Sequence, residues 1–371
     1  SVKKSERRRA VELKELSPPV GTRVAVACSG GVDSSFALMQ LQRDGMDVEA
    51  FTLRVIDSTK NEFAVVDAAE VARKLEVPHH VIDIRDRFRQ LVIADFAEEY
   101  ARGRTPNPCV RCNERVKFGL LRGIARELGC DYLATGHYAR ILHDGTSWGL
   151  YRGTDDTKDQ AYALYRLKTE QLPFTLFPAG LLSKWAVRQL AVTSGLVTAQ
   201  KEESQDICFI DGDYARFLAE LGFASPPGDI VDTTGRLLGR HKGLHSYTVG
   251  QRRNLGLPGG TDPYYVIELR PADNTLLVGN KADLLSRSFT VSDCNWLIEP
   301  PLHEPMHCGI RIRYHSAIQL GRVHAGPEGL ASVVLGLPFE AITPGQSAVF
   351  YDGDRVLGGG VIEKVERQSA V

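Results

Sequence analysis

A short run of glycine and hydroxyl residues near the start of the chain has the composition of a phosphate-binding loop. The run is Ser29–Ser35, and it places Gly30 beside Gly31 and Asp33 two residues later. Paired glycines let the backbone turn tightly and aim its N–H groups at an anion, and a following helix adds unpaired donors. Asp33 suits a Mg²⁺ ion that bridges phosphates better than it suits a phosphate itself. The run predicts a nucleotide-phosphate site, with a plain strand-to-helix turn as the alternative interpretation.

This loop differs from the two commonest nucleotide motifs. It lacks the lysine of a Walker A loop, and its glycines do not have the spacing of a dinucleotide fingerprint. It resembles instead the pyrophosphate loop of the ATP pyrophosphatase superfamily, whose members cleave ATP between the α and β phosphates and adenylate a carbonyl oxygen. The resemblance implies ATP and Mg²⁺ as cofactors but no particular substrate.

A second segment, Gly103–Asn113, combines two prolines with the C-x-x-C pair Cys109 and Cys112. The prolines prevent a regular helix from running through it, so we expect a stiff loop that leads into a helix at Glu114. Cys112 would then sit at a helix N-terminus, which lowers the pKa of a thiol. Three arginines are nearby in sequence: Arg104, Arg111 and Arg115. Because such a loop is a poor core site, we expect these two cysteines to do chemistry.

The other five cysteines divide into packing and candidate functional residues. Seven cysteines, an odd number without a secretory signal, indicate a reducing cytosol rather than a disulfide framework. Four lie within apolar segments and are expected to be buried: Cys28, Cys130, Cys294 and Cys308. Cys208, within Glu203–Ile210, fits packing and chemistry equally well.

The elements that must position these residues alternate between strand and helix patterns in the first half. Predicted strands are Thr22–Ala27, Val48–Val55, His79–Ile84 and Tyr132–Thr135. Predicted helices cover Ser34–Arg43 and the apolar faces within residues 64–75, 88–100 and 116–128. This alternation predicts right-handed βαβ units and an α/β domain with a parallel sheet. The phosphate loop would follow its first strand.

Beyond about residue 212, glycines and prolines separate much shorter segments. Short strands are predicted at Phe289–Val291, Cys308–Tyr314, Ile318–Val323, Ala331–Leu335, Ala348–Tyr351 and Gly360–Val365. They favour a small β-barrel or sandwich. We therefore expect a basic N-terminal tail over 1–21, an ATP pyrophosphatase domain over 22–212, a small central domain over 213–285 and a C-terminal β-barrel over 286–371.

Composition excludes some classes of protein. The hydrophobic fraction of 43% and the charged fraction of 25% are those of an ordinary globular protein. No run of about 18 apolar residues exists, so no membrane span is expected, and the start of the chain lacks a secretory core. A cytoplasmic protein is expected. The net charge of −1 means that any RNA contact uses local basic patches. The run Lys3, Lys4 and Arg7–Arg9 is such a candidate, or simply a solvated tail.

Seven segments together resemble one family, the bacterial tRNA-specific 2-thiouridylases of the MnmA type. They are Ser29–Ser35, Gly103–Asn113, Ala134–Tyr138, Lys158–Gln160, Ile207–Ile210, Gly250–Arg252 and Thr343–Tyr351. The match runs in order from about residue 22 to 366. It implies an adenine nucleotide alpha hydrolase-like domain and thiolation of the wobble uridine in tRNAs for Lys, Glu and Gln. It also implies a sulfur-donor relay protein or a cysteine desulfurase as partner.

The resemblance assigns roles by position. Cys208 matches the cysteine that carries a persulfide, and Cys112 matches a second cysteine that helps to release its sulfur. Implied nucleotide-binding residues are Ala27, Cys28, Ser29, Gly30, Gly31, Val32, Asp33, Ser34, Leu53 and Gly136. Implied contacts to the target base are Asn107, Pro108 and Cys109, and implied tRNA contacts are His137, Lys158, Asp159, Gln160, Arg313, Tyr314 and Gln346.

One position departs from the family. Its best-known form has an Asp with an acid–base role where this chain has Cys109, and a thiol with a pKa of about 8.5 cannot simply replace that acid. Three thiols, Cys109, Cys112 and Cys208, suit a 4Fe–4S cluster with one iron open for the sulfide to be transferred. Some members and relatives are described as cluster-dependent, and the cluster is the favoured hypothesis. The alternatives are a zinc ion with His137 as fourth ligand, or a Cys208 persulfide without metal.

The sequence therefore predicts an ATP-dependent tRNA-uridine 2-sulfurtransferase that forms AMP and pyrophosphate. The enzyme would adenylate the C2 oxygen of the uridine, and sulfur would then displace AMP. Two other classes stay open at this point. One is an AMP-forming ligase of the same superfamily acting on a small molecule, which would have no use for three cysteines. The other is a non-catalytic RNA-binding protein, which would not need an intact phosphate loop.

Overall fold

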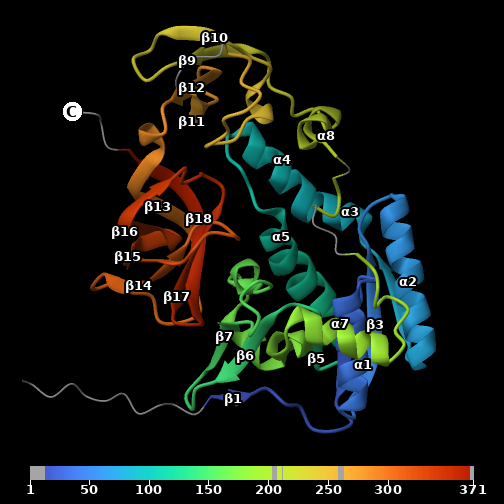
Figure 1. Ribbon diagram of the computed structural model, residues 1–371. Helices are drawn as coiled ribbons and strands as arrows, with labels where there is room; N and C mark the ends of the chain where they lie inside the picture. The colour runs from blue at the N-terminus through green and yellow to red at the C-terminus, as the bar shows by residue number, and fades with distance from the viewer. Residues whose placement is uncertain (1–12, 203–206, 211, 258–262, 368–371) are drawn as a thin grey trace, which may run out of the picture.

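The computed structural model describes residues 13–202, 207–210, 212–257 and 263–367. The basic run at Lys3, Lys4 and Arg7–Arg9 lies outside the described residues. Within these ranges the strands form three sheets, and the chain passes from an α/β body through a small β unit into an antiparallel barrel (Figure 1). No helix in the described part of the chain combines the length and the apolar character needed to cross a membrane.

The α/β body is built on a five-stranded parallel sheet in the order β4-β3-β2-β5-β8. Its strands are β2 (Arg23–Ala27), β3 (Asp47–Arg54), β4 (His79–Asp83), β5 (Tyr132–Thr135) and β8 (Thr175–Leu176). The chain runs from β2 outward to β4 and then returns to place β5 on the other side of β2. The carboxyl ends of β2 and β5 therefore flank the switch point where ligands bind in such sheets.

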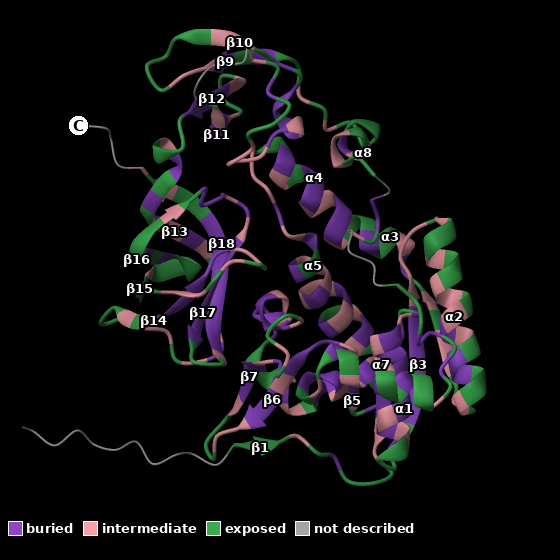
Figure 2. Ribbon diagram, in the orientation of Figure 1, coloured by how far each residue is buried: buried purple, intermediate pink, exposed green. Residues whose placement is uncertain are grey.

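Helices cover both faces of this sheet, and the strands alternate between them. Val24 and Val26 of β2 pack toward α1 (Val32–Arg43), α2 (Thr59–Leu75) and α7 (Lys184–Thr193). Ala25 packs on the opposite face toward α5 (Pro108–Arg111), η2 (Cys112–Leu121) and α6 (Arg122–Glu127). This division follows from the period of two along a strand. Figure 2 shows the strands of this sheet as mostly buried.

A further helical layer follows β4. It comprises α3 (Arg85–Phe88), η1 (Arg89–Ile93) and α4 (Ala94–Ala101), and it packs in one apolar cluster with the segment around Phe209. Three short 3₁₀ helices precede α7 in the chain. They are η3 (Ala161–Leu164), η4 (Thr169–Phe174) and η5 (Pro178–Leu181).

The central unit begins with α8 (Tyr214–Glu220) and has a four-stranded sheet in the order β10-β9-β12-β11. Its strands are β9 (Gly228–Val231), β10 (Leu237–His241), β11 (Tyr265–Arg270) and β12 (Thr275–Gly279), with the turns η6 (Leu244–Ser246) and η7 (Ala282–Leu284) beside them. Buried Ile230, Val266 and Leu276 form its own small core.

The last unit is a closed antiparallel barrel, because β17 pairs with both β14 and β18. Its strands are β13 (Leu285–Trp296), β14 (Met306–Arg311), β15 (Gln319–Ala325), β16 (Ala331–Glu340), β17 (Ser347–Asp352) and β18 (Arg355–Glu366), with η8 (Pro327–Gly329) between β15 and β16. All six predicted strand segments are present. β13 and β18 are longer than predicted because bulges between them absorb register shifts without ending the pairing.

The sequence analysis missed one antiparallel element of the α/β body. β6 (Ala139–His143) and β7 (Trp148–Arg152) form a hairpin, and β1 (Lys14–Glu15) pairs with its outer edge. β7 also pairs with β18 at Tyr151 and Arg355, so the hairpin continues the barrel sheet. The α/β body and the barrel are thus joined through backbone pairing as well as side chains.

A second difference concerns the cysteine segment. A helix was expected from Glu114, after a stiff loop, but helical structure begins at Pro108. Proline is compatible with the first helical position because that residue needs no N–H donor. The Asn107 side chain caps this start by accepting a hydrogen bond from the Cys109 N–H at 3.2 Å. Both cysteines therefore lie on a helix, which widens into the π-helix η2 at Cys112.

Candidate functional site

The phosphate loop lies between β2 and α1, as predicted. Gly30 has a φ of +67°, and a Cβ there would come within 2.5 Å of the Ala64 carbonyl oxygen of α2, so only glycine fits. Hydroxyl groups brace the loop from within. The Ser35 Oγ donates to the Gly31 carbonyl at 2.9 Å, and the Ser29 N–H donates to the Ser34 Oγ at 3.1 Å. The loop is therefore held in shape before any ligand binds.

The outer side of the loop is open at the helix start. Gly31 is the N-cap of α1, and no side chain caps the helix there. A Cβ on Gly31 would meet nothing closer than the Ser29 Oγ at 3.6 Å. The first N–H groups of a helix lack intrahelical partners, so this end of α1 offers donors and a positive dipole end to an anion. The residues present fit a bound phosphate group.

The other nucleotide candidates surround this helix start. A Cβ on Gly136, which follows β5, would lie 2.6 Å from the backbone of Asp33 and Ser34, so the two segments touch. Leu53, half-buried, stands near the end of β3. Burial raises the pKa of the Cys28 thiol to about 12. That cysteine therefore stays a neutral packing residue, as expected, and can serve a nucleotide only through its main chain.

Asp33 already has two partners in the structure. Both of its carboxylate oxygens lie 2.7 Å from Lys184 Nζ, and the Tyr138 hydroxyl donates to Oδ1 at 2.7 Å. The Asp33 side chain keeps 29% of its surface exposed, so an edge of the carboxylate is open to a metal ion. Sequence reasoning missed Lys184, because no spacing rule connects residues 151 positions apart.

The three candidate thiols come together on one side of the body. Cys112 packs against the same apolar cluster as Phe209 and Ile207, which hold the segment that carries Cys208. The rings of Phe88 and Phe96 lie 5.7 and 5.5 Å from that of Phe209 and fix this segment on the helical layer. Cys109 and Cys208 are exposed, and Cys112 is partly buried.

The charge states of these thiols correct one expectation. The helix start and the nearby arginines were expected to lower the pKa of Cys112, but burial raises it to about 12, and the neighbouring Cys208 and Cys109 thiols also raise it. Cys109 and Cys208 keep exposed surface, but neighbouring atoms surround their thiols enough that burial raises the pKa of each. The helix starts four residues before Cys112, which weakens the effect of its N-terminus.

The arginines do not serve the thiols because carboxylates hold them. Arg111 lies 2.9 Å from Asp293 of the barrel, and Arg166 binds the same carboxylate at 3.0 Å. Arg104 bridges Glu99 and the barrel residue Glu363 at 2.8 and 2.6 Å. Arg115 pairs with Asp95 at 2.9 Å. The pairs with Asp293 and Glu363 fasten the cysteine segment to the barrel, and those with Asp95 and Glu99 hold it on α4.

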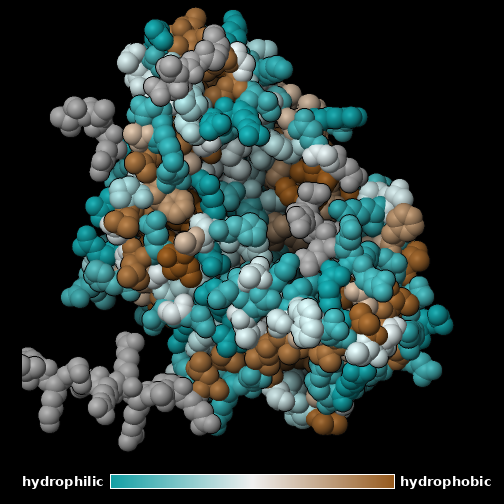
Figure 3. Space-filling view, viewed as in Figure 1, coloured by the Kyte–Doolittle hydropathy of each residue, from teal (hydrophilic) through white to brown (hydrophobic). Residues whose placement is uncertain are grey.

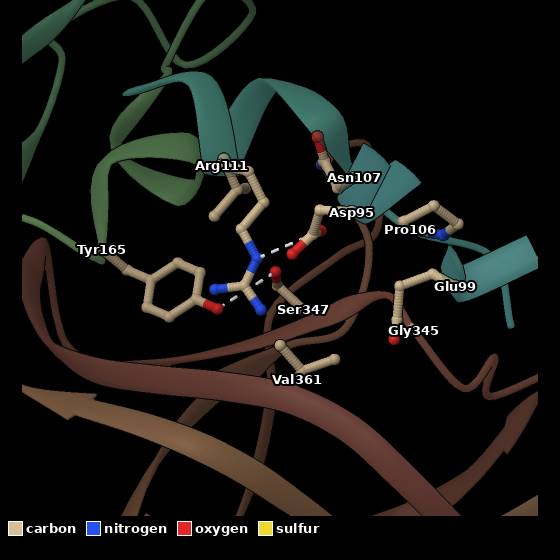
Figure 4. A pocket seen from close by; sticks show the side chains of 10 residues that line it. Asp95, Glu99, Pro106, Asn107, Arg111, Tyr165, Gly345, Ser347 and Val361 are labelled. Atoms are coloured by element: carbon tan, nitrogen blue, oxygen red, sulfur yellow. Dashed lines mark hydrogen bonds and ion pairs between the residues drawn. The ribbon is translucent and has the colours of Figure 1, made fainter. Parts of the chain in front are cut away.

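A small pocket opens within this contact between α4, α5 and the barrel. Figure 4 shows Arg111 lying between Asp95 and the Tyr165 and Ser347 side chains, with the backbone of Gly345 and Val361 below. Its polar lining belongs to the ion pairs just described. The pocket is part of the interface between the α/β body and the barrel.

One cation does reach the thiols. Lys117 lowers the pKa of Cys109, Cys112 and Cys208 through its charge, although less than burial raises each of them. In a π-helix the backbone hydrogen bonds join residues five positions apart. Lys117, five residues after Cys112, therefore lies one turn away on the same face of η2. Lys117 Nζ also lies 3.4 Å from His137 Nε2. The sequence analysis missed Lys117 because in a regular α-helix its side chain would point away from Cys112.

His137 is less accessible than its predicted roles require. Burial, together with the charge of Lys117, lowers its pKa well below the usual value, so the ring is neutral. Its Nδ1 lies 2.6 Å from the Thr135 hydroxyl, and Nε2 faces Lys117. Across the described residues, no three His, Cys, Asp or Glu side chains converge closely enough to hold a metal ion. As placed, the donor set fits neither a cluster nor a zinc ion.

Two of the predicted RNA residues are anchored inside the protein. The Asp159 carboxylate is fully buried between Arg152 and Arg311, at 3.2 and 3.1 Å. Gln160 accepts a hydrogen bond from the Tyr138 N–H at 2.9 Å and so supports the residue that binds Asp33. Lys158, between them and the solvent, is half-buried.

One of the three barrel candidates, Gln346, contacts the cysteine loop. Gln346 donates to the Thr105 carbonyl at 2.8 Å, and the preceding Gly345 packs so closely on Thr105 that a Cβ would lie 2.7 Å from its nitrogen. Arg313 donates to the Ala341 and Glu340 carbonyls, and the Tyr314 ring packs edge-on to Tyr162 at 6.0 Å. Asn107 and Pro108 form the helix start, where Asn107 is half-buried and Pro108 is buried.

Known families match the chain in three consecutive parts. A model described as the tRNA methyl transferase HUP domain matches residues 22–212, a tRNA methyl transferase PRC-barrel domain matches 215–280, and an aminomethyltransferase beta-barrel domain matches 286–362. The tRNA-specific 2-thiouridylase MnmA of Carboxydothermus hydrogenoformans is 44% identical over 357 residues, which cover 92% of this chain and 98% of the relative. That of Chloroflexus aggregans is 45% identical over 355 residues, covering 92% and 99%.

Similarity to solved structures is weaker. The U34-tRNA thiolase NcsA from Methanococcus maripaludis with its 4Fe–4S cluster has a TM-score of 0.34 at 17% identity, covering 54% of this chain and 64% of its own. A 4-thiouridine synthetase–RNA complex with bound ATP has a TM-score of 0.37 at 17% identity, covering 52% and 46%. Likeness this weak carries no weight for the site. The near full-length relatives and the matched families show the family to which the chain belongs.

Proposed function

This chain belongs to the tRNA-specific 2-thiouridylase family, and from that premise we propose how its own residues perform the thiolation of tRNA. The enzyme replaces the C2 oxygen of a tRNA uridine with sulfur. Membership in this ATP pyrophosphatase family implies the use of ATP and Mg²⁺. The proposed target is the wobble uridine of tRNAs for Lys, Glu and Gln, and the proposed place of action is the cytoplasm.

One chain of contacts carries the proposal because it connects the phosphate loop to the thiols. Gly136 packs directly on the backbone of Asp33 at the start of α1. The next residue, His137, lies 3.4 Å from Lys117, whose charge acts on all three thiols. A nucleotide on the loop and a sulfur on a cysteine would therefore react with the same bound uridine.

In the first step the loop would hold ATP for attack by the uridine. The N–H groups at the start of α1 and the Ser29 and Ser34 hydroxyls would bind phosphate oxygens, and the exposed edge of Asp33 would hold Mg²⁺. The C2 oxygen of the uridine attacks the α-phosphorus, and pyrophosphate leaves. Positioning and charge stabilisation supply the catalysis here, and the adenylated oxygen becomes a good leaving group.

In the second step sulfur would come from Cys208. Its thiol is exposed and can accept a persulfide from a donor protein, which we propose is a relay protein or a cysteine desulfurase. The terminal sulfur attacks C2, and AMP leaves. The Cys112 thiolate then attacks the Cys208 sulfur, which frees the C2 sulfur and leaves a disulfide that a thiol reductant must open. The fixed positive charge of Lys117 favours the sulfur anions in both reactions.

The 4Fe–4S hypothesis is not used in these steps. It requires Cys109, Cys112 and Cys208 to converge on one metal centre, and the described residues contain no such group of three. It stays a prediction, as do the base and tRNA contacts proposed for Asn107, Pro108, Cys109, His137, Lys158, Asp159, Gln160, Arg313, Tyr314 and Gln346. For Asp159, whose carboxylate is buried, the proposed role is to position its neighbours.

The decisive experiment follows both products of the reaction. Purified enzyme is given ATP, Mg²⁺, an unmodified tRNA transcript for Lys and a persulfide donor, and AMP and 2-thiouridine are measured. We expect the two products in equal amounts, and neither with a transcript that carries cytidine at the wobble position. AMP formed from small carboxylic acids without tRNA would point to the small-molecule ligase instead. Tight tRNA binding without ATP turnover would point to a non-catalytic RNA-binding protein.

A further inference from the structure

The phosphate loop contains no lysine, but the fold brings one to it from a distant helix. Lys184 is the first residue of α7, and its ammonium lies 2.7 Å from both carboxylate oxygens of Asp33. Asp33 is the second residue of α1, next to the helix start where the phosphates would bind. The Lys184 side chain is 10% exposed. A cation therefore sits at the anion-binding end of α1 and is largely withdrawn from bulk water.

Several contacts fix Lys184 in this place. Ser183 caps α7 by accepting a hydrogen bond from the Ala186 N–H at 3.2 Å. The Lys184 N–H donates to Asp155 at 2.9 Å, which ties the start of α7 to the loop after β7. The Lys184 ammonium also lies 5.7 Å from the centre of the Tyr138 ring, over its face. Lys184, Asp33 and Tyr138 thus form one ordered group on the rim of the loop.

A purely structural role explains this arrangement poorly. Taking an ammonium and a carboxylate out of water costs free energy that their attraction only partly returns, so buried ion pairs are weak stabilisers. Asp33 is also not the group that needs neutralising in the complete site, since ATP brings several negative charges. Positive charge is what the site requires when the nucleotide arrives.

We propose that Lys184 is the phosphate-binding lysine of this loop, held ready by Asp33 and Tyr138 until the polyphosphate of ATP binds. The inference rests on the proposed use of ATP at the loop. The ammonium would bind non-bridging oxygens of the β and γ phosphates and would stabilise the charge on departing pyrophosphate. Lys184 thus has the function that a lysine within the loop has in Walker A proteins. AMP, which lacks those phosphates, would gain little from it.

The test compares nucleotide binding rather than turnover, with EDTA present so that the metal role of Asp33 does not contribute. Affinities for ATP, pyrophosphate and AMP are measured by calorimetry on the wild type, Lys184→Met and Asp33→Asn. We expect Lys184→Met to lose about tenfold or more in affinity for ATP and pyrophosphate, the size of one charge-assisted contact, with AMP changed less than about threefold. Asp33→Asn should bind ATP at least as well as the wild type, because phosphate no longer competes with the carboxylate.

The double variant Lys184→Met/Asp33→Asn distinguishes phosphate binding by Lys184 from neutralisation of Asp33. It also keeps the test possible if Lys184→Met alone does not fold. Replacing both members of a buried pair is tolerated better than breaking it, so this protein should fold if Lys184→Met does not. The proposal requires the double variant to bind ATP as weakly as Lys184→Met while still binding AMP. A role limited to neutralising Asp33 predicts recovery of ATP affinity in the double variant, and that recovery would overturn the proposal.

Two controls complete the design. Lys74→Met removes a lysine from the far end of α2, where its ammonium binds the Gly195 carbonyl, and should leave all three affinities unchanged. Lys184→Arg keeps the charge and should retain most of the ATP affinity. If the wild type binds no ATP, the proposed function itself fails. If the wild type binds ATP and Lys184→Met binds it equally well, only the assignment of Lys184 fails.

Discussion

At the scale of single residues, the three thiols show how burial can override local sequence context. Cys112 lies on a helix beside arginines, a setting that favours a thiolate, yet burial raises its pKa to about 12. Arg111 is held by Asp95, Glu114 and Asp293, and the cation that lowers the pKa of all three thiols is Lys117. Because the thiolate is the nucleophile, Cys112 must lose its proton before it attacks the Cys208 sulfur, and burial makes that loss less favourable.

The first prediction separates the persulfide from the cluster. Cys109→Ala, Cys112→Ala and Cys208→Ala are purified without oxygen and assayed for iron and for 2-thiouridine formation. The proposed chemistry requires Cys112 and Cys208 but not Cys109, so we expect the first variant to keep most of its activity and the other two to lose it. Stoichiometric iron in the wild type, lost together with activity in all three variants, would establish the cluster instead.

At the scale of elements, β2, β3 and β4 are connected by a single buried carboxylate. Glu49 of β3 pairs with Arg23 of β2 and with His80 of β4, the latter at 2.7 Å. Burial alone would raise the pKa of Glu49, but the hydrogen bonds from Arg23 and His80 lower it below its usual value. The phosphate loop follows β2, the strand that carries Arg23, so this carboxylate helps to hold the strand that leads into the loop.

The second prediction concerns this carboxylate and pH. Glu49→Gln should lower the free energy of unfolding by about 1.5–3 kcal/mol at pH 7, the range for hydrogen bonds to charged groups. Because the folded pKa of Glu49 is depressed, its contribution is present above the unfolded pKa and disappears as the pH falls through the folded one. Denaturant unfolding at pH 7 and pH 3 should therefore show a larger difference between wild type and variant at pH 7. An equal difference at both pH values would contradict the assignment.

At the scale of the whole molecule, the barrel is fastened to the helix that carries the cysteines. Asp293 of β13 has a φ of +51° and binds Arg111 and Arg166 of the α/β body. Gln346 and Gly345 pack on the loop before Cys109. Figure 3 shows separate hydrophobic patches on the visible side, and exposed apolar side chains such as Phe63, Trp185 and Leu320 belong to different elements.

The third prediction tests this connection. Asp293→Asn keeps a residue that tolerates positive φ and removes only the charge. Since Asp293 is half exposed, solvent screening limits the loss of stability to about 0.5–1 kcal/mol. We expect slower sulfur transfer in single-turnover assays with unchanged ATP affinity, because Arg111 adjoins Cys112. The matched control is Asp354→Asn, which removes one ion pair each from Arg140 and Arg152 at the hairpin and should leave sulfur transfer at the wild-type rate.

The fourth prediction concerns the RNA surface. Lys158→Ala should weaken tRNA binding and reduce the slope of log affinity against log salt by about 0.7–0.9, the contribution of one phosphate contact. ATP affinity should not change. Lys364→Ala, on an exposed position of β18, is the control and should keep the wild-type slope. An unaltered slope in Lys158→Ala would place the RNA surface elsewhere.

The sequence by itself determined what is local. The phosphate loop, the strand before it, the helix after it and the strands of the barrel follow from glycine placement and hydrophobic period, because these depend on neighbouring residues. The resemblance to the family rested on contiguous motifs and was confirmed by the near full-length relatives. The hairpin β6–β7 was missed although Asp144–Gly145 is a turn signal between two apolar runs.

Only the tertiary structure decided which distant residues come into contact and how burial shifts the pKa of the ionisable groups. Lys184 reaches Asp33 across 151 positions because α7 packs beside α1, and Cys208 reaches Cys112 because Phe209 is buried in the helical layer. The pKa of Cys112 depends on burial, and the place of Lys117 depends on the wide turn of a π-helix. None of these can be computed from spacing, since each results from the packing of segments far apart in the chain.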